Sequence, residues 1–515
     1  MRMLKEQARR TPPPQWVRVV GGFTHHQFAE KRLPTLKEIN DAAPDTPVFI
    51  LHLYDRALLN RAALRAVGYD KEVPSFPASE VERDSHGNPT GLLIAKPNAT
   101  ILYTALGKGP KLSYDDQINS TRHFMREMNR LGLTSVIDAG GGGHSFPDDY
   151  KVIEQLNRQN LLTTRIAYNL FTQRPKQEKA DFANWVKVLK PGQGSDMYRA
   201  NGAGEMLVYS AADFEDFLVA RPEMPPNMEK DLLEVATLLA ENRWPFRLHA
   251  TYDQTIERTL NVLEQVNKEA PLGELHWILD HAETISERNM ERVKALGGGI
   301  AIQHRLAYQG EDFIKRYGKQ AAGQSPPVRK MLAMGIPVGG GTDATRVASY
   351  NPFVCLYWLV SGKTLGGTQM YAGPDRLSRE EALKIWTEGG TWFSREEGKK
   401  GKIAAGQFAD LAVLSADYFS VPQEAIKGLE SVLTIVGGKV VHGAGEFARL
   451  APPLPPASPD WSPVRKFGGY YRADSSIAPA APASVAAMAS QAQCRSHDHA
   501  SLSERWGLDC DCFAF

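Results

Sequence analysis

Residues 245–282, PFRLHATYDQTIERTLNVLEQVNKEAPLGELHWILDHA, carry the pattern that decides the fold. Two short apolar stretches, at 245–250 and 277–282, flank a long amphipathic helix pattern. A strand with one solvent-exposed face alternates polar and apolar residues, and neither stretch does so. Lack of alternation is typical of parallel strands that are buried on both faces. Short apolar strands that alternate with helices predict βα units that form a parallel sheet.

The same alternation continues on both sides of this stretch. A doubly wound open sheet and a (β/α)8 barrel both fit such a pattern, but polar side chains end several strands, where barrel active sites are built. We count seven strands rather than eight, so the sequence predicts an α/β fold, a TIM-like (β/α)8 barrel that lacks its first strand. The seven strands lie near Ser135, Ile166, Tyr198, Arg247, Ile278, Ala301 and Val338.

The chain divides into four regions. Residues 1–115 form an N-terminal segment with strand-like pieces such as VFILHLY and GLLIA, and residues 116–400 hold barrel strands two to eight. Residues 401–449 contain Gly-punctuated strands that predict a small antiparallel β unit. Residues 450–515 form a Pro/Ala-rich tail that we interpret as linker or disorder, with an end that contains cysteines and histidines.

Composition excludes several classes of protein. The 515 residues include 60 Lys and Arg against 59 Asp and Glu, which leaves no electrostatic footprint for nucleic acid or an anionic membrane. Four cysteines do not make a disulfide-framed secreted scaffold, and no apolar run is long enough to span a membrane. We expect a small-molecule substrate, a homodimer, and a cytoplasmic location unless a signal peptide precedes Met1.

Two histidines stand directly after apolar strands. His249 ends PFRLHA and His281 ends WILDHA, about one βα unit apart, so a barrel would point both imidazoles into one mouth. Asp343 ends IPVGGGTD on a later strand. A lone histidine at a strand end is more often a hydrogen-bonded structural residue. The set of three favours a divalent metal, with Zn the first choice, because imidazole and carboxylate are its usual ligands.

Other stretches resemble a known family. REEALKIWTEGGTW (379–392), GKIAAGQFADLAVLSAD (401–417) and VLTIVGGKVVH (432–442) are similar to the closing segments of the amidohydrolase superfamily. The stretch from Val19 to Leu64, VVGGFTHHQF through LLNRAAL, resembles the insertion of its amidohydrolase 3 (YtcJ-like) family, which includes N-substituted formamide deformylase. The resemblance covers about residues 16–445.

The resemblance implies a metal-dependent hydrolase of amide-like or formamide-like C–N bonds. His249, His281 and Asp343 match the family signature on the fifth, sixth and eighth strands. Asp343 would serve as a metal ligand and as the general base that takes the proton of a metal-activated water. The β unit at 401–449 would be the remnant of a small β-sandwich.

The sequence departs from this pattern at two strands. The family's first strand ends in His-x-His, whereas here the His-x-His is formed by His497 and His499 in the tail, so we expect an N-terminally truncated chain. The fourth strand, YRANGAGE, holds no lysine that could become carboxylated and bridge two metals. Glu205 could replace it as a carboxylate ligand, or could instead be a loop or capping residue.

Further residues have weaker signals. Asn201, His304 and Arg346 are candidates for substrate binding, each with a structural alternative: packing, burial or a surface ion pair. Asp138 could simply cap the loop after its strand. The adjacent pair at residues 25 and 26, both histidines, is expected at the surface of the insertion.

Two other functions stay open. The chain could be an inactive or binding-only amidohydrolase-like fragment that lacks the first-strand His-x-His. An open-sheet nucleotide-binding enzyme is a weaker alternative, because LTSVIDAGGGGHS lacks G-x-G-x-x-G leading into a helix. The tail has chemistry suited to a soft metal but no standard zinc-ribbon spacing, at Cys494, His497, His499, Cys510 and Cys512.

Overall fold

The computed structural model describes residues 1–70, 80–95, 99–140, 145–214, 217–218 and 220–465. The chain forms two compact units. The first unit contains residues Met1–Glu127, Thr342–Asn351 and the segment from Pro453 onward, and the second contains Met128–Gly341 and Pro352–Pro452. None of the described helices is long and apolar enough to cross a membrane.

Parallel strands form the centre of the second unit, and the described residues contain all seven that the sequence predicts. One sheet has the order β6-β7-β8 and the other the order β12-β11-β10-β9, and a parallel bridge from Ala203 to Phe246 joins them. The strands are β6 (Ser135–Asp138), β7 (Arg165–Leu170), β8 (Tyr198–Ala203), β9 (Arg247–Ala250), β10 (Ile278–His281), β11 (Gly299–Gln303) and β12 (Val338–Gly341).

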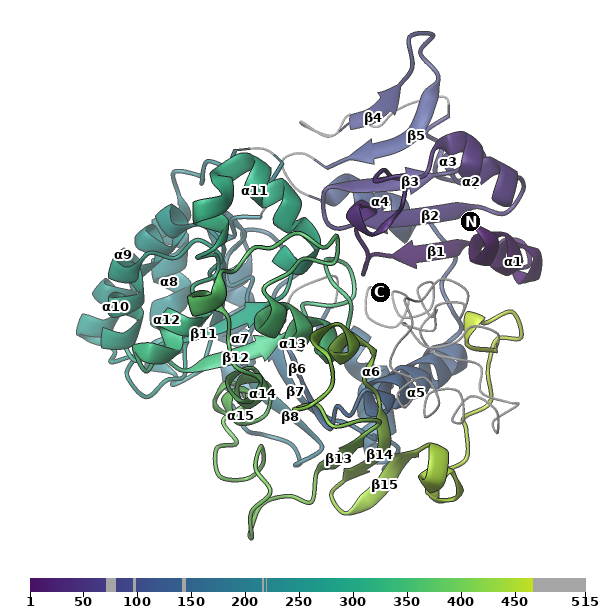
Figure 1. Cartoon of the computed structure of the whole chain (residues 1–515). Helices are drawn as coiled ribbons and strands as arrows, with labels where there is room; N and C mark the ends of the chain where they lie inside the picture. The colour runs from purple at the N-terminus through teal and green to yellow at the C-terminus, as the bar shows by residue number, and fades with distance from the viewer. Residues whose placement is uncertain (71–79, 96–98, 141–144, 215–216, 219, 466–515) are drawn as a thin grey trace. The chain divides into compact units, whose positions relative to one another are not determined.

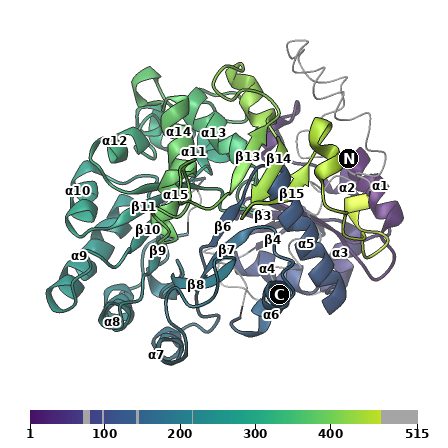
Figure 2. The ribbon, with the colours of Figure 1, turned by 90° about the horizontal axis from the view of Figure 1, so that it is seen from below.

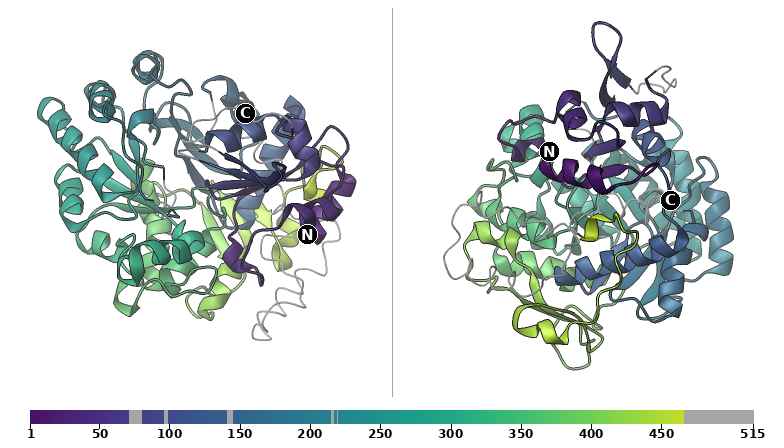
Figure 3. Two further views of the ribbon diagram at one scale, coloured as in Figure 1. Left: turned by 90° about the horizontal axis from the view of Figure 1, so that it is seen from above. Right: turned by 90° about the vertical axis from the view of Figure 1, so that its right-hand side faces the viewer.

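Helices cover the outer side of this row of strands, as Figure 2 and the left view of Figure 3 show. Each helix buries an apolar stripe; in α9, for example, Ile256, Leu260 and Leu263 are buried at the three- and four-residue spacing of one helix face. The helices between the strands are α6 (Lys151–Arg158), α7 (Glu178–Val188), α8 (Met228–Glu241), α9 (Asp253–Glu269), α10 (Glu287–Ala295), α11 (Leu306–Ala322) and α12 (Val328–Ala333). After β12 come α13 (Pro352–Ser361), α14 (Arg379–Trp386) and α15 (Glu388–Phe393).

The two outer strands of the row differ from the inner ones. Among the described residues, β6 pairs only with β7, and β12 pairs only with β11. All four residues of β6 are half-buried, whereas every residue of β7, β8, β9 and β10 is buried. The observed architecture is therefore seven parallel strands in chain order, and closure of a barrel by an eighth strand stays a prediction.

A three-stranded antiparallel sheet follows α15, where the sequence predicts a small β unit. It consists of β13 (Leu411–Leu414), β14 (Ser431–Val436) and β15 (Lys439–Gly443), in that order. A buried ion pair attaches this region to the strand row, because the Arg165 guanidinium at the start of β7 donates to the Asp410 carboxylate at 2.7 Å and 3.0 Å. The Thr434 hydroxyl also donates to the Asn129 carbonyl at 2.6 Å.

The first unit is built on a five-stranded sheet with the order β1-β2-β3-β5-β4, in which only β1 and β2 are parallel. The strands are β1 (Val17–Val20), β2 (Val48–His52), β3 (Arg56–Leu59), β4 (Glu80–Arg83) and β5 (Pro89–Ile94). The helices are α1 (Arg2–Arg10), α2 (Leu36–Ala42), α3 (Arg61–Val67) and α4 (Thr100–Gly107), and α5 (Tyr114–Arg130) leads from the first unit into the second (Figure 1). Every residue of β2 is buried, and alternate side chains enter two separate apolar clusters.

One fully buried amide fixes the corner where β2, β3 and α3 meet. The Asn60 side-chain oxygen accepts from the backbone N–H groups of Val48 and Ala63, both at 2.9 Å. Its amide nitrogen donates to the carbonyls of Ala43 at 2.6 Å and Thr46 at 2.9 Å. The Asn60 amide oxygen and amide nitrogen thus each form two hydrogen bonds to the backbone. Helix α3 begins at the next residue.

Replacing this amide should destabilise the first unit strongly. We expect Asn60→Ala to lower the free energy of unfolding by at least about 3 kcal/mol, because several buried backbone groups lose their partner at about 1–3 kcal/mol each. The measurement is urea unfolding of the whole chain. Asn40→Ala is the matched control, since Asn40 accepts a single bond from the Arg61 N–H, and it should cost less than about 1 kcal/mol. Equal losses in the two variants would contradict the assignment.

Candidate metal centre

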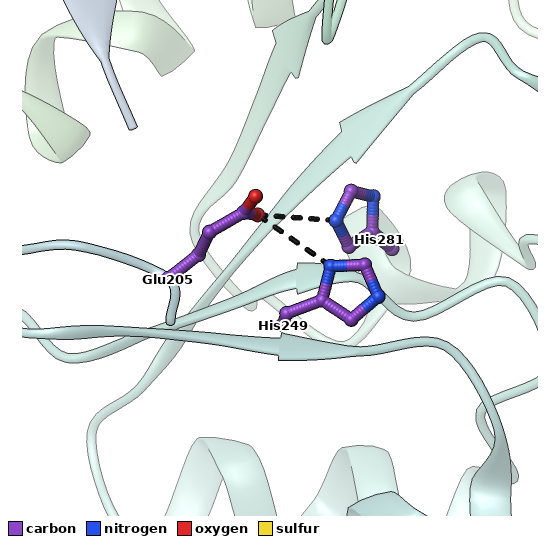
Figure 4. Close-up of side chains that lie close together, drawn as sticks. All are labelled: Glu205, His249 and His281. Carbon is purple, nitrogen blue, oxygen red and sulfur yellow. Dashed lines mark hydrogen bonds and ion pairs between the residues drawn. The ribbon is translucent and has the colours of Figure 1, made fainter. Parts of the chain in front are cut away.

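Three side chains of the second unit converge at the carboxyl ends of adjacent strands. One ligand atom each of Glu205, His249 and His281 lies within 4.8 Å of the others. The Glu205 Oε2 atom is 3.1 Å from His281 Nε2 and 3.8 Å from His249 Nδ1. Figure 4 shows the carboxylate pointing at both rings, whose centroids are 4.2 Å apart. The side chains are 14%, 5% and 4% exposed, so the group is shielded from bulk water.

The strand register places the two histidines. In the parallel pair of β9 and β10, Asp280 lies beside His249, and His281 follows at the end of β10. A buried ion pair locks this register, because Arg247 Nε donates to the Asp280 carboxylate at 2.8 Å. His281 has a φ of 82°, which is a left-handed backbone conformation at the residue whose imidazole belongs to the group. Such strained backbone costs about 1–3 kcal/mol and is concentrated at functional sites.

Glu205 is held by its backbone two residues after β8. Its N–H donates to the Ala139 carbonyl, and its own carbonyl accepts from the His249 N–H, both at 3.0 Å. The preceding residue has to be glycine, because a Cβ at Gly204 would lie 2.4 Å from the Gly140 carbonyl oxygen. The close approach of the loops after β6 and β8, together with these two hydrogen bonds, fixes the backbone position of Glu205.

The electrostatics of the group favour an ionised carboxylate. Burial opposes charge on Glu205, but the hydrogen bonds and charges of His249 and His281 outweigh it and hold the pKa of Glu205 well below its usual range. Burial also opposes charge on His281, yet the hydrogen bond and charge of Glu205 leave the pKa of that imidazole raised. The Glu205 carboxylate therefore favours the charged form of His281, and the two imidazoles favour the ionised form of Glu205.

The far side of the His281 ring contacts a buried polar network. Gln303 Nε2 and an Arg305 guanidinium nitrogen each lie 3.4 Å from His281 Nδ1, and Gln303 Nε2 also donates to Glu283 at 2.9 Å. Burial raises the pKa of Glu283 to about 7. Since a guanidinium can only donate, it meets the Nδ1 lone pair, and the ring proton then lies on Nε2, toward Glu205. These donors hold the ring in place, but they differ from the acceptors that usually take the second ring N–H of a metal-ligating histidine.

A second buried carboxylate stands beside His249. Asp213 Oδ1 lies 3.8 Å from His249 Nε2, and this side chain accepts the N–H groups of Thr251 at 2.8 Å and Tyr252 at 2.9 Å. Burial raises the pKa of Asp213, although the His249 charge and these hydrogen bonds oppose it. Sequence reasoning missed Asp213, because it does not directly follow a strand and belongs to no motif. The only signal in the sequence is an acidic residue in the long loop after β8.

Asp343, the expected general base, is not part of the group of three. It lies two residues after β12, in the segment Thr342–Asn351 that packs with the first unit, and has a φ of 50°. Arg346 belongs to the same segment, and its guanidinium lies 5.0 Å from the centre of the Tyr103 ring. Within the second unit, the group therefore contains His249, His281 and the alternative ligand Glu205.

The other predicted site residues have structural surroundings. The Asn201 amide donates to Asn169 at 3.2 Å and to the Phe393 carbonyl at 3.0 Å. His304 is fully buried, and burial lowers its pKa to about 3, so the ring is neutral. Burial raises the pKa of Asp138 to about 6, although its carboxylate accepts the Gly140 N–H at 2.9 Å, as a loop cap would.

Two further histidine predictions have different outcomes. His25 and His26 are half-buried rather than exposed, and their ring centroids lie 4.0 Å apart. The His25 ring also contacts the ring of His52 at the end of β2, with centroids 5.4 Å apart. The cysteine and histidine set of the tail lies outside the described residues.

The donor set fits a divalent ion of the zinc type. Two ligands bonded to one Zn²⁺ at about 2.0–2.2 Å lie up to about 4.3 Å apart, so the observed spacing needs only small side-chain shifts. Two imidazoles and one carboxylate are a usual ligand set for catalytic zinc, with an open fourth position. For an ion to bind at His281 Nε2, the proton of the neutral ring would have to move to Nδ1.

Known proteins resemble the chain over most of its length. A family model described as the amidohydrolase family matches residues 1–442. The putative amidohydrolase YtcJ of Bacillus subtilis is 25% identical over 457 residues, which is 85% of this chain and 82% of that protein. The N-substituted formamide deformylase of Arthrobacter pascens is 24% identical over 452 residues, covering 85% and 81%.

Solved structures share the fold. An uncharacterised metal-dependent hydrolase of Pyrococcus horikoshii has a TM-score of 0.56 and 16% identity, covering 82% of this chain and 85% of that one. One from Pyrococcus furiosus has a TM-score of 0.54 and 18% identity, covering 79% and 80%. The family match over residues 1–442 shows that this chain belongs to the amidohydrolase family, the enzymes that hydrolyse carbon–nitrogen bonds.

Proposed function

We propose that this chain is a metal-dependent hydrolase of amide-like or formamide-like C–N bonds, with a divalent ion, Zn as first choice, bound by Glu205, His249 and His281. The observation that carries the proposal is the convergence of one carboxylate and two imidazoles within 4.8 Å at the ends of β8, β9 and β10. The formamide deformylase among the relatives supports the substrate class. Closure of the strand row as a TIM-like barrel, without its first strand, belongs to the same proposal.

The chain's own residues would divide the work. Bound at this group, the ion would polarise a water and lower its pKa toward neutrality. Asp343 accepts the proton of the attacking water and passes it to the departing nitrogen, because an amine leaves as a neutral molecule. Gln303 and Arg305 keep the His281 ring in place, and the buried surroundings exclude bulk water from the reacting groups.

A binding-only protein is the second candidate function. It is favoured by one observation: the candidate metal-binding group holds three of the described residues, and the proposed base Asp343 is not among them. Asn201, His304 and Arg346 stay predicted substrate contacts, although the hydrogen bonds of Asn201 and the burial of His304 favour structural roles. Metal binding without turnover would select this second function.

Removing a ligand should weaken metal binding more than a change elsewhere does. We expect His249→Ala, His281→Ala and Glu205→Gln each to lower Zn²⁺ affinity by at least about 100-fold, because even loss of a residue that only supports a ligand costs about 10–100-fold. Calorimetric titration of metal-free protein with Zn²⁺ measures this. His276→Ala is the control: this half-buried histidine pairs with Glu397 at 3.0 Å and should keep its affinity. Unchanged binding in all three variants would refute the metal site.

A substitution at Asp343 separates the roles of base and ligand. We expect Asp343→Asn to lower kcat for formamide hydrolysis by about 100-fold or more, since a positioned proton acceptor supplies about 10²–10⁴-fold. Zn²⁺ affinity should change by less than about threefold if Asp343 acts only as the base. Parallel loss of affinity would assign it as a fourth ligand. Absence of turnover in the unaltered chain, with Zn²⁺ bound, would support the binding-only protein.

A further inference from the structure

The first unit carries a pocket of about 960 Å³ that the proposed hydrolysis does not use. It is formed by the loop before α2, by α3, by β3 and by the β4–β5 hairpin, all within residues 25–92. Its size is at the upper end of the range of about 300–1,000 Å³ that is usual for small-molecule sites. Leucine side chains supply an apolar part of its wall: Leu33, Leu36, Leu58, Leu64 and Leu92.

Basic side chains outnumber acidic ones around this pocket, six against three. Three of the cations are already neutralised. Arg32 pairs with Glu38 at 2.8 Å, Lys37 pairs with Asp41 at 2.6 Å, and Arg56 pairs with Asp55 at 2.8 Å. The three remaining cations, Lys31, Arg61 and Arg65, equal the three lining acids in number, so an anion site depends on where these cations lie and not on a net positive charge.

Arg61 and Arg65 are two of those remaining cations. Both are exposed, and neither forms an ion pair or a side-chain hydrogen bond within the part of the chain that the structure describes. They lie one turn apart on α3, so their side chains leave the same helix face, with Cβ atoms about 5–6 Å apart. Like charges at this spacing repel, and an anion between them would remove the repulsion.

The chemistry of the pocket defines its ligand. Guanidinium groups present donors in a planar fork that matches the oxygens of a carboxylate or a phosphate. Of the leucines, Leu33, Leu36 and Leu92 are half-buried and offer contact to an apolar group, which a small inorganic ion lacks. We propose that this pocket binds an amphipathic organic anion, with its carboxylate or phosphate head at Arg61 and Arg65 and its alkyl or aryl body on the leucines.

Calorimetric titration of the whole, metal-free chain tests this with four probes. Octanoate and octyl phosphate carry a head and a chain, octanol carries the chain alone, and inorganic phosphate carries the head alone. We expect one or both of the first two probes to bind at least tenfold more tightly than octanol and inorganic phosphate, and the tighter one identifies the head group. Equal affinity for octanol and octanoate, together with equal affinity for inorganic and octyl phosphate, would overturn the proposal.

Variants locate the site. Arg61→Gln with Arg65→Gln should weaken octanoate or octyl phosphate binding by at least tenfold, and Arg61→Lys with Arg65→Lys should give a smaller loss because the charge stays. Lys315→Gln with Arg316→Gln is the control. These residues are exposed cations on α11, and the double substitution removes the same amount of charge from the second unit. Leu36→Gln should weaken the chain-bearing probe while leaving both arginines in place. Retained affinity in the Arg61 and Arg65 glutamine variant, with an unchanged circular dichroism spectrum, would refute the site.

Discussion

A buried carboxylate has to be paired, and in this protein that requirement is met by two imidazoles from neighbouring strands. Glu205 would pay a large desolvation cost alone, since an unpaired charge in a protein interior is among the most unfavourable groups. His249 and His281 remove that cost, and they can do so only because β9 and β10 lie parallel in the observed register. The Arg247–Asp280 ion pair and the close approach of Gly204 to Gly140 serve the same arrangement.

The sequence predicted the strands of the second unit well because their pattern is local. Each βα unit combines a short apolar stretch with an amphipathic helix, and the seven expected strands are all present among the described residues. His249 and His281 could be identified for the same reason, since a polar residue directly after a buried strand points to the functional edge of a parallel sheet. Glu205 was found as an alternative, because a carboxylate follows a strand that lacks the expected lysine.

The rest of the site depends on tertiary contacts that no local pattern reveals. Asp213 reaches His249 from a loop with no strand signal, and Arg305 reaches His281 Nδ1 from the start of α11. Asn201 lies on a strand of the row and was a predicted substrate contact, but its amide donates hydrogen bonds to Asn169 and to the Phe393 carbonyl. In the first unit, the strand-like pieces VFILHLY and GLLIA lie at β2 and β5, but the pairing was inaccessible, because β3 pairs with β5 across the sequence of α3 and β4.

The first unit consists of segments that are far apart in the sequence, and this affects how it forms during synthesis. Gln7 on α1 donates to the Trp461 carbonyl at 2.9 Å, and Asn119 donates to the Pro456 carbonyl, so this unit is completed by segments more than 330 residues downstream. A ribosome adds about 5–20 residues per second, so α1 waits roughly 20–90 s for its contact with Trp461. The second unit ends at Pro452, so it is itself still being synthesised during most of that interval, and the surface of α1 that later meets Trp461 stays uncovered until the last described segment is made.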